Sequence, residues 1–108
     1  MEKVILKIKN GNGKGKEYDD NGKWIFEGEY INGIKNGKGK DYNFLGKLIF
    51  EGEYLDGKRN GKGKEYDYDK LIFEGEYLNG ERNGKGKEYD DGKLIFEGEY
   101  VDGIKTKF

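Results

Sequence analysis

Apolar and polar residues alternate along most of this chain, and strict alternation predicts short β-strands. In the Phe-Glu-Gly-Glu-Tyr segment at 50–54, the Phe, Gly and Tyr fall on one side of an extended chain and the two Glu on the other. The Gly-Lys-Gly-Lys-Glu-Tyr segment at 61–66 alternates in the same way, with its two Lys on the side opposite its two Gly. We therefore predict two neighbouring strands rather than a helix.

A turn rich in Gly and Asn separates these two segments. Asp56-Gly57 and Asn60-Gly61 supply the residues of positive φ that tight turns need. The sequence predicts a β-hairpin with a first strand over Lys47–Tyr54, a turn over Leu55–Asn60 and a second strand over Gly61–Tyr66. The 20 glycines also argue against helix, because each interior Gly costs a helix up to ~1 kcal/mol relative to Ala.

The hairpin recurs along the whole chain. Copies of its first segment begin at Phe26, Phe50, Phe73 and Phe96, so the period is 23 or 24 residues. A fixed period of this length indicates one supersecondary unit stacked on copies of itself. We predict a single array over residues 1–108, in which 1–25 is an N-terminal capping or partial repeat, 26–49, 50–72 and 73–95 are full repeats, and 96–108 is a C-terminal partial repeat.

The predicted fold is an all-β, single-layer, elongated and twisted antiparallel sheet of tandem hairpins. Only 32% of the residues are hydrophobic and 40% are charged, yet aromatic residues make up 15% and fall at fixed repeat positions, which argues against disorder. No Pro interrupts the ladders. Nine or ten strands would give a sheet roughly 40 Å long.

One face of such a sheet carries rows of Phe and Tyr, and we expect Gly on the next strand to lie beneath each ring. These rows hold neighbouring repeats together. A single layer has no second layer to cover them, so we also expect an exposed apolar strip that binds a protein partner or a second copy of the chain. The expected partner-binding residues are Phe26, Tyr30, Phe50, Tyr54, Phe73, Tyr77, Phe96 and Tyr100.

The opposite face carries Glu pairs and Lys pairs, which form a charge ladder if they lie side by side across the strands. One interpretation is a solvated face of weak ion pairs. The alternative is a peripheral membrane module that binds anionic lipids or phosphoinositides. Its expected lipid-binding residues are Lys58, Arg59, Lys62, Lys64, Arg82, Lys85 and Lys87.

Catalysis is not expected from this composition. The chain has no His or Cys, no Ser, and one Thr at position 106, which excludes Ser/His and Cys/His nucleophiles and zinc sites built on His or Cys. The carboxylate pair Glu27 and Glu29 recurs in every copy, whereas a catalytic pair should be unique. The Asp pairs at 19–20 and 90–91 lack the spacing of a calcium loop. We predict no enzyme, no cofactor and no metal.

Charge and targeting signals narrow the remaining classes. The 21 basic and 22 acidic residues balance, so we expect no nucleic-acid partner, and no small-molecule substrate is expected either. The apolar stretch Val4–Ile8 is too short for the core of a signal peptide. The expected location is cytoplasmic, with membrane association under the lipid alternative.

These segments resemble MORN repeats (membrane occupation and recognition nexus), whose pattern is aromatic-Glu-Gly-Glu-aromatic, then Asn-Gly with basic residues, then Gly-x-Gly. The resemblance covers about residues 12–103. It implies successive hairpins in an elongated, groove-bearing sheet, and a scaffold that binds partners, self-associates or attaches to membranes. The chain departs from the pattern in two places. The His that commonly precedes Gly-x-Gly is Asn36, Asn60 and Asn83, and Val4, Leu6 and Ile8 replace the Phe, Gly and Tyr of the first strand, which predicts a capping strand.

Overall fold

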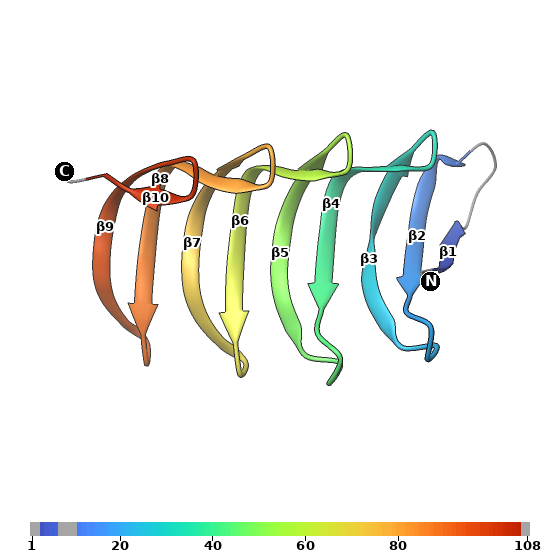
Figure 1. Cartoon of the computed structure of the whole chain (residues 1–108), viewed down its shortest axis with the longest axis horizontal. Coiled ribbons are helices and arrows are strands. Elements are labelled where there is room, and N and C mark those ends of the chain that lie inside the picture. Colours follow the sequence, from blue (N-terminus) through green and yellow to red (C-terminus); the bar gives the residue numbers. More distant parts are fainter. Residues whose placement is uncertain (1–2, 7–10, 107–108) are drawn as a thin grey trace.

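The described residues, 3–6 and 11–106 of the computed structural model, form one antiparallel sheet in which every strand pairs with its neighbours in sequence (Figure 1). The strands are β1 (Lys3–Leu6), β2 (Gly13–Tyr18), β3 (Trp24–Ile31), β4 (Ile34–Tyr42), β5 (Leu48–Leu55), β6 (Lys58–Asp67), β7 (Lys70–Leu78), β8 (Glu81–Asp90), β9 (Lys93–Val101) and β10 (Ile104–Lys105). This arrangement confirms the predicted single-layer sheet of tandem hairpins.

Two kinds of strand alternate across the sheet. Strands β3, β5, β7 and β9 carry Phe-Glu-Gly-Glu-Tyr and are called Phe strands here, and strands β2, β4, β6 and β8 carry Gly-Lys-Gly-Lys and are called Lys strands. Each junction sets Gly opposite Gly and Glu opposite Lys, as in Gly52 opposite Gly63 and Glu51 opposite Lys64. The register therefore confirms that the Glu pairs and the Lys pairs share a face.

The predicted hairpin turn was too long. β5 extends to Leu55 and β6 begins at Lys58, so the turn consists of Asp56 and Gly57 alone, with φ of 50° and 86°. Positive φ at both central residues is the signature of the tight turn that matches the twist of a hairpin. Asn60-Gly61, which we assigned to the turn, instead lies inside β6 at a bulge.

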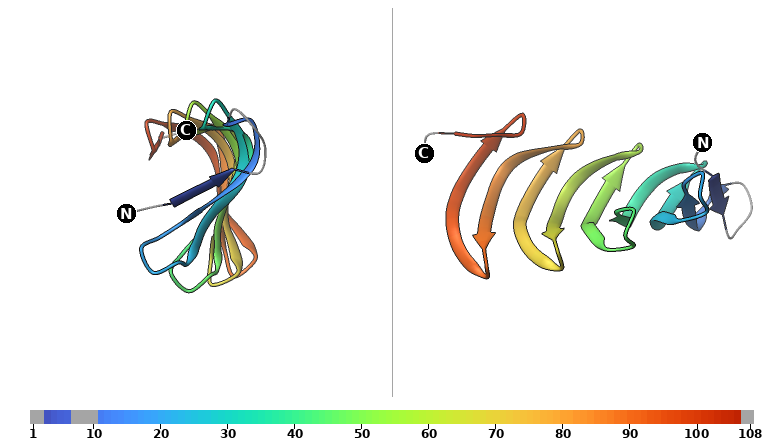
Figure 2. Two further views of the ribbon diagram at one scale, coloured as in Figure 1. Left: turned by 90° about the vertical axis from the view of Figure 1, so that its right-hand side faces the viewer. Right: turned by 60° about the horizontal axis from the view of Figure 1, so that its bottom comes forward.

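The sheet is elongated and curved. It measures 46 × 26 × 19 Å, with the first and last strands at opposite ends of the long axis (Figure 1). Viewed along that axis, the strands follow an arc, and successive hairpins are rotated slightly relative to one another (Figure 2). The length agrees with the expected stacking of strands.

The N-terminal strand pairs with the array as a cap. β1 forms four antiparallel pairs with β2, including Val4 opposite Glu17 and Leu6 opposite Gly15. These two residues therefore occupy the register positions of Phe and Gly, as the sequence predicts. Ile8, the third residue of the predicted cap, lies outside the described residues.

Candidate functional site

The predicted aromatic rows form the core of the molecule. Phe26, Phe50 and Phe73 each meet two Tyr rings edge to face, one from the same strand and one from the next repeat, as Phe50 does with Tyr54 at 5.7 Å and Tyr77 at 5.2 Å between ring centroids. Phe96 meets Tyr100 of its own strand. The same contacts connect all eight rings from Tyr30 to Phe96 in one continuous row. The edge-to-face arrangement is favourable for aromatic quadrupoles.

A basic side chain covers each Phe ring from the solvent side. The guanidinium of Arg59 lies 3.9 Å from the centre of the Phe50 ring, and that of Arg82 lies 4.0 Å from the centre of Phe73. The ammonium groups of Lys35 and Lys105 occupy the same place over Phe26 and Phe96. Cation–π contacts are worth roughly 0.5–1 kcal/mol at exposed sites and more where the cation is desolvated. These cations are partly exposed, from 23% of the side chain for Lys35 to 49% for Lys105.

An acidic residue connects each cation to a Tyr hydroxyl. Tyr30 donates a hydrogen bond of 2.5 Å to Glu17, and Lys35 lies 3.7 Å from the same carboxylate. The other repeats contain the same trio of Tyr, acid and cation: Tyr54, Asp41 and Arg59; Tyr77, Glu65 and Arg82; Tyr100, Glu88 and Lys105. Among the described residues, no buried side-chain polar atom is without a partner.

Several members of these trios have shifted pKa values. Burial raises the pKa of Tyr54 and Tyr77 well above the usual tyrosine range, and the hydrogen bonds to Asp41 and Glu65 raise it further. Burial alone would raise the pKa of Glu65, but the hydrogen bonds from Arg82 and Tyr77 hold that pKa below its usual range. Neutral Tyr77 and charged Glu65 are thus the stable forms in the fold.

The expectation of an exposed apolar strip is wrong. Of the eight residues predicted to bind a partner, seven are at most 5% exposed, and Phe96 is half-buried. The cations cover one side of the rings, and the glycines of the neighbouring strand let the rings pack directly on the backbone. A Cβ on Gly63, for example, would lie 2.6 Å from the Phe50 ring. The rings are therefore buried without a second layer of structure. These aromatic residues therefore stabilise the array, and they leave little surface for a partner.

The opposite face contains an open groove that runs the length of the array. Its walls are the Glu and Lys side chains, and its floor is the backbone of the glycines between them. The groove encloses about 1460 Å³. Its lining comes from all eight Phe and Lys strands, at 14–16, 27–29, 38–40, 51–53, 62–64, 74–76, 85–87 and 97–99.

The groove carboxylates of each full repeat are held by the protein itself. Glu53 accepts a hydrogen bond of 2.7 Å from the backbone N–H of Lys62, and Glu51 accepts one of 3.1 Å from the hydroxyl of Tyr66. The first contact recurs at Glu29 and Glu76, and the second at Glu27 and Glu74. Burial and the bond to Glu27 raise the pKa of Tyr42 to about 12.

Six of the eight lysines that line the groove, in contrast, are unpaired. These lysines are Lys38, Lys40, Lys62, Lys64, Lys85 and Lys87. Within the described part of the chain, their ammonium groups form no ion pair or hydrogen bond, although Glu lies on both neighbouring strands. The predicted charge ladder exists in register, but it is not a ladder of ion pairs. Its free hydrogen-bond donors are available to a ligand.

Aliphatic side chains border the groove at the hairpin edge. Ile31, Leu55, Leu78 and Val101 end the Phe strands one residue after the buried Tyr, which by alternation places them on the groove face. Each is about half exposed. The sequence analysis did not identify this border, although an aliphatic residue directly follows every Phe-Glu-Gly-Glu-Tyr segment.

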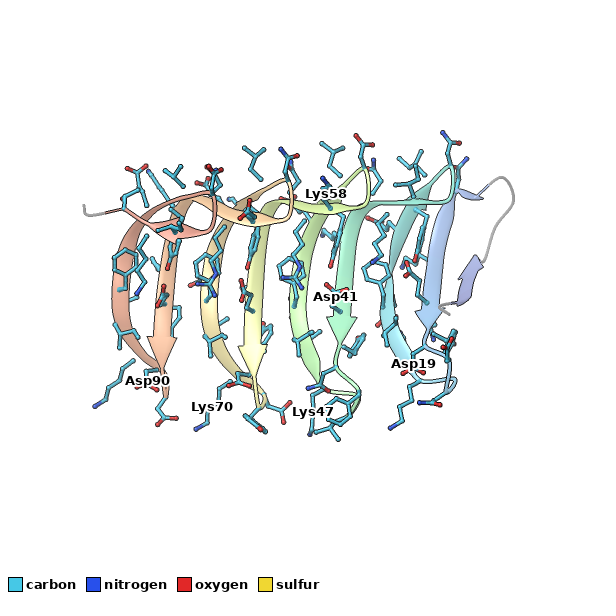
Figure 3. The ribbon with its side chains drawn as sticks, in the orientation of Figure 1. Asp19, Asp41, Lys47, Lys58, Lys70 and Asp90 are labelled. Carbon is cyan, nitrogen blue, oxygen red and sulfur yellow. The ribbon has the colours of Figure 1, made fainter. Side chains whose placement is uncertain are left out.

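The seven residues predicted to bind lipid do not share one surface. Lys62, Lys64, Lys85 and Lys87 lie in the groove, whereas Arg59 and Arg82 cover Phe rings on the other face. Lys58 lies at the hairpin edge, opposite the edge that carries Lys47 and Lys70 (Figure 3). Of the seven residues predicted to bind lipid, four therefore lie together in the groove.

The groove carboxylates of the full repeats are bonded within the fold. Among the described residues, no group of three or more Asp or Glu side chains could hold a metal ion, and no helix is long and apolar enough to cross a membrane. The repeated carboxylates are engaged by Tyr hydroxyls and backbone N–H groups rather than placed as an acid and a base across an open space. The arrangement is suited to binding.

Comparison with known families identifies the repeat. The MORN repeat model matches residues 26–40, 50–71 and 73–93, which together are more than half of the chain. No curated protein matches the sequence as a relative.

Proposed function

This chain belongs to the MORN repeat family, and on that premise we propose that it is a non-catalytic scaffold whose groove binds an elongated acidic segment of a protein partner. MORN repeats are generally interaction and scaffold modules, and the family is in general not enzymatic. The proposal moves the binding surface from the aromatic rows, which are buried, to the opposite face.

The observation that carries this proposal is the periodic row of unpaired lysines. Equivalent lysines such as Lys40, Lys64 and Lys87 lie two strands apart, a spacing of roughly 9.6 Å. Because the neighbouring carboxylates are already bonded to Tyr hydroxyls or backbone N–H groups, an acidic ligand forms new ion pairs without breaking strong existing ones. A partner with acidic groups at a similar spacing fits the row.

The aliphatic border adds a contact that a purely ionic ligand would not use. Leu55 and Leu78 are 49% and 50% exposed beside the groove, and apolar surface of this kind stabilises protein interfaces. An elongated protein segment with acidic residues on one side and apolar residues along its edge contacts both features. This combination favours a protein partner over a lipid headgroup.

The proposal can be tested with one groove variant and one matched control. The groove variant changes Lys38, Lys40, Lys62 and Lys64 to Gln, and the control changes the exposed edge lysines Lys47 and Lys70 to Gln. We expect crosslinking and mass spectrometry of proteins bound to the wild type to place their crosslinks on groove lysines, and binding of those proteins to be lost in the groove variant but kept in the control. Partners that bind the groove variant as well as the wild type would overturn the proposal.

Vesicle cosedimentation tests the lipid alternative with the same variants. Binding to anionic vesicles that is screened by salt and lost in the groove variant would favour a peripheral membrane module. No difference between anionic and neutral vesicles would leave the protein partner as the better interpretation.

A further inference from the structure

The repeat pattern is broken at one turn. The turn from β4 to β5, residues 43–46, lies at the edge of the array where Lys47 and Lys70 are labelled in Figure 3. It contains Phe44 and Leu45, which are 69% and 62% exposed. Two Asp occur in each of the other described turns at this edge, which span residues 19–22, 67–70 and 90–92. The turn therefore presents apolar surface where its counterparts present carboxylates.

A small pocket lies between this turn and Trp24. Its lining comes from Lys23, Trp24, Tyr42 and residues 44–46, and it encloses about 240 Å³. Trp24 is itself a departure from the repeat, because its counterparts in β5, β7 and β9 are leucines. The rings of Trp24 and Tyr42 have centroids 5.0 Å apart and are tilted by 46°. Small-molecule pockets usually enclose ~300–1,000 Å³, so this pocket is suited to a single large side chain.

The pocket adjoins the groove. The ammonium group of Lys16, which lines the groove, lies 4.2 Å from the centre of the Trp24 ring. The hydroxyl of Tyr42 donates a hydrogen bond of 2.9 Å to Glu27, which also lines the groove. Lys40 precedes Tyr42 by two residues in β4 and so lies on the same face of the sheet. A segment bound along the groove therefore passes within reach of the pocket.

Charge at the pocket favours an acidic segment. The ammonium group of Lys23 donates a hydrogen bond of 3.0 Å to the backbone carbonyl of Phe44. Its counterpart in the next repeat, Lys47, pairs instead with the carboxylate of Asp69. Within the described residues, Lys23 forms no ion pair. The positive charge of Lys23 is thus available to a carboxylate of a ligand.

The groove lysines alone do not fix the position of a ligand along the array. Because equivalent lysines recur every two strands, an acidic segment shifted by ~9.6 Å meets the same charges again. We propose that the pocket is a specificity subsite, which binds one aromatic side chain of the acidic segment and so fixes the register of that segment in the groove. The rings of Trp24 and Tyr42 offer such a side chain the edge and face contacts that aromatic pairs prefer. The proposal rests on the function proposed above.

A pair of synthetic peptides serves as the probe. A polyproline II helix has three residues per turn and a rise of ~3.1 Å, so every third side chain lies on one side at a spacing of ~9.3 Å. A peptide of four Glu-Pro-Pro units thus places its carboxylates close to the spacing of Lys40, Lys64 and Lys87. In the Phe peptide, the Pro after the third Glu is replaced by Phe. In the matched Ala peptide, it is replaced by Ala.

Trp24 reports on the pocket directly, because it is the only Trp in the chain and neither peptide contains one. We expect the Phe peptide to shift the Trp24 fluorescence to shorter wavelength and the Ala peptide to leave it unchanged. In isothermal titration calorimetry, the Phe peptide should bind the wild type roughly tenfold more tightly, because its ring is removed from water.

The register is measured by carbodiimide crosslinking, which joins a carboxylate to a lysine that lies in contact with it. We expect the Glu before Phe to crosslink mainly to Lys40, whereas the same Glu of the Ala peptide should crosslink to Lys40, Lys64 and Lys87 alike. The pocket variant changes Phe44 and Leu45 to Ser. Its control is Tyr68→Ser, which removes an exposed aromatic side chain from the corresponding turn of the next repeat. Circular dichroism confirms that both variants are folded.

The advantage of the Phe peptide should disappear in the pocket variant and persist in Tyr68→Ser. Equal binding of the two peptides to the wild type, or an advantage that the pocket variant keeps, would overturn the subsite and leave the groove proposal standing. If neither peptide binds the wild type, or if the groove variant binds both as the wild type does, the groove proposal is overturned and the subsite with it.

Discussion

At the residue scale, the core of this protein depends on glycines, because a side chain at these positions would occupy the space of a neighbouring ring or strand. A Cβ on Gly52 would lie 2.6 Å from the backbone of Gly63 and of Lys62, and 2.8 Å from the Phe50 ring. Strand propensity spans only ~1 kcal/mol and favours Val over Gly, whereas overpacking typically costs ~1–3 kcal/mol. The steric effect should therefore prevail.

We accordingly expect Gly52→Val and Gly75→Val each to lower the free energy of unfolding by about 2 kcal/mol. Val at the exposed strand position Lys62 serves as the control, and there stability should be unchanged or slightly raised. Urea unfolding of the variants measures the difference. If both Gly variants unfolded at the same urea concentration as the wild type, the rings would not lie over these glycines.

The buried tyrosines predict a loss of stability in alkali. The pKa of Tyr54, Tyr77 and Tyr100 is raised above the unfolded value of 10.0, first by burial and then by the bonds to their acids. Their contribution is therefore fully present below pH 10 and is lost as the pH rises above 10, because the unfolded chain then releases protons that the folded chain keeps. Urea unfolding at a series of pH values should show this fall, and it should be smaller for Tyr77→Phe.

The sequence was sufficient to identify the core residues at this scale but not to predict what covers them. Alternation in β6 extends from Glu65 through Gly63 and Gly61 to Arg59, which already places Arg59 on the aromatic face. We missed it because Asn60-Gly61 was taken to be a turn. The contact between the guanidinium and Phe50 depends on how the long side chain crosses the bulge, and no spacing rule predicts that path.

At the scale of the strand, the bulge within each hairpin from β3 to β8 is held by one carboxylate, from Glu29, Glu53 or Glu76. Three residues of β6, from Asn60 to Lys62, stand opposite Glu53 of β5. Gly61 at their centre has a φ of 101°, and Glu53 bonds to the next backbone N–H. Sequence patterns could indicate the glycine, but they could not distinguish a bulge from a turn, because both need positive φ.

Substitution of the bulge glycine should therefore be costly. In Gly61→Ala, the new Cβ would lie 2.3 Å from Oε1 of Glu53 in a backbone conformation that Ala rarely adopts. We expect the free energy of unfolding to fall by about 1–3 kcal/mol. Thermal unfolding followed by circular dichroism measures the change. Lys62→Ala keeps the bulge and is the control; equal stability of the two variants would contradict the assignment.

At the scale of the whole molecule, every described strand pairs only with its neighbours in sequence, and ring and ion-pair contacts such as Phe50 with Tyr77 join one repeat to the next, so repeats are exchangeable units. The fold class followed from the period and the alternation alone. The period and the alternation did not predict which face stays open, because that depends on the side chains of Arg59, Arg82 and their equivalents, which cover the Phe rings.

Deletion of one central unit, residues 50–72, should leave a folded and shorter array. The deletion joins Ile49 to Phe73 and preserves the order of Phe and Lys strands. Circular dichroism should retain its β signal, and small-angle X-ray scattering should show a molecule shorter by ~10 Å, the width of two strands. Loss of all β signal would show that the repeats are not independent units.

The covering of the core by single side chains changes how burial scales with chain length. In a compact globular domain, the fraction of surface buried on folding rises with size, so larger domains tolerate a lost contact more easily. Here each additional repeat adds one buried Phe, one buried Tyr and one Lys or Arg over the ring, so the ratio of buried to exposed surface stays nearly constant. Such a protein can lengthen without any limit set by its core. Greater length also does not make the array more tolerant of a lost contact, because a defect destabilises its own repeat by the same amount in a long array as in a short one.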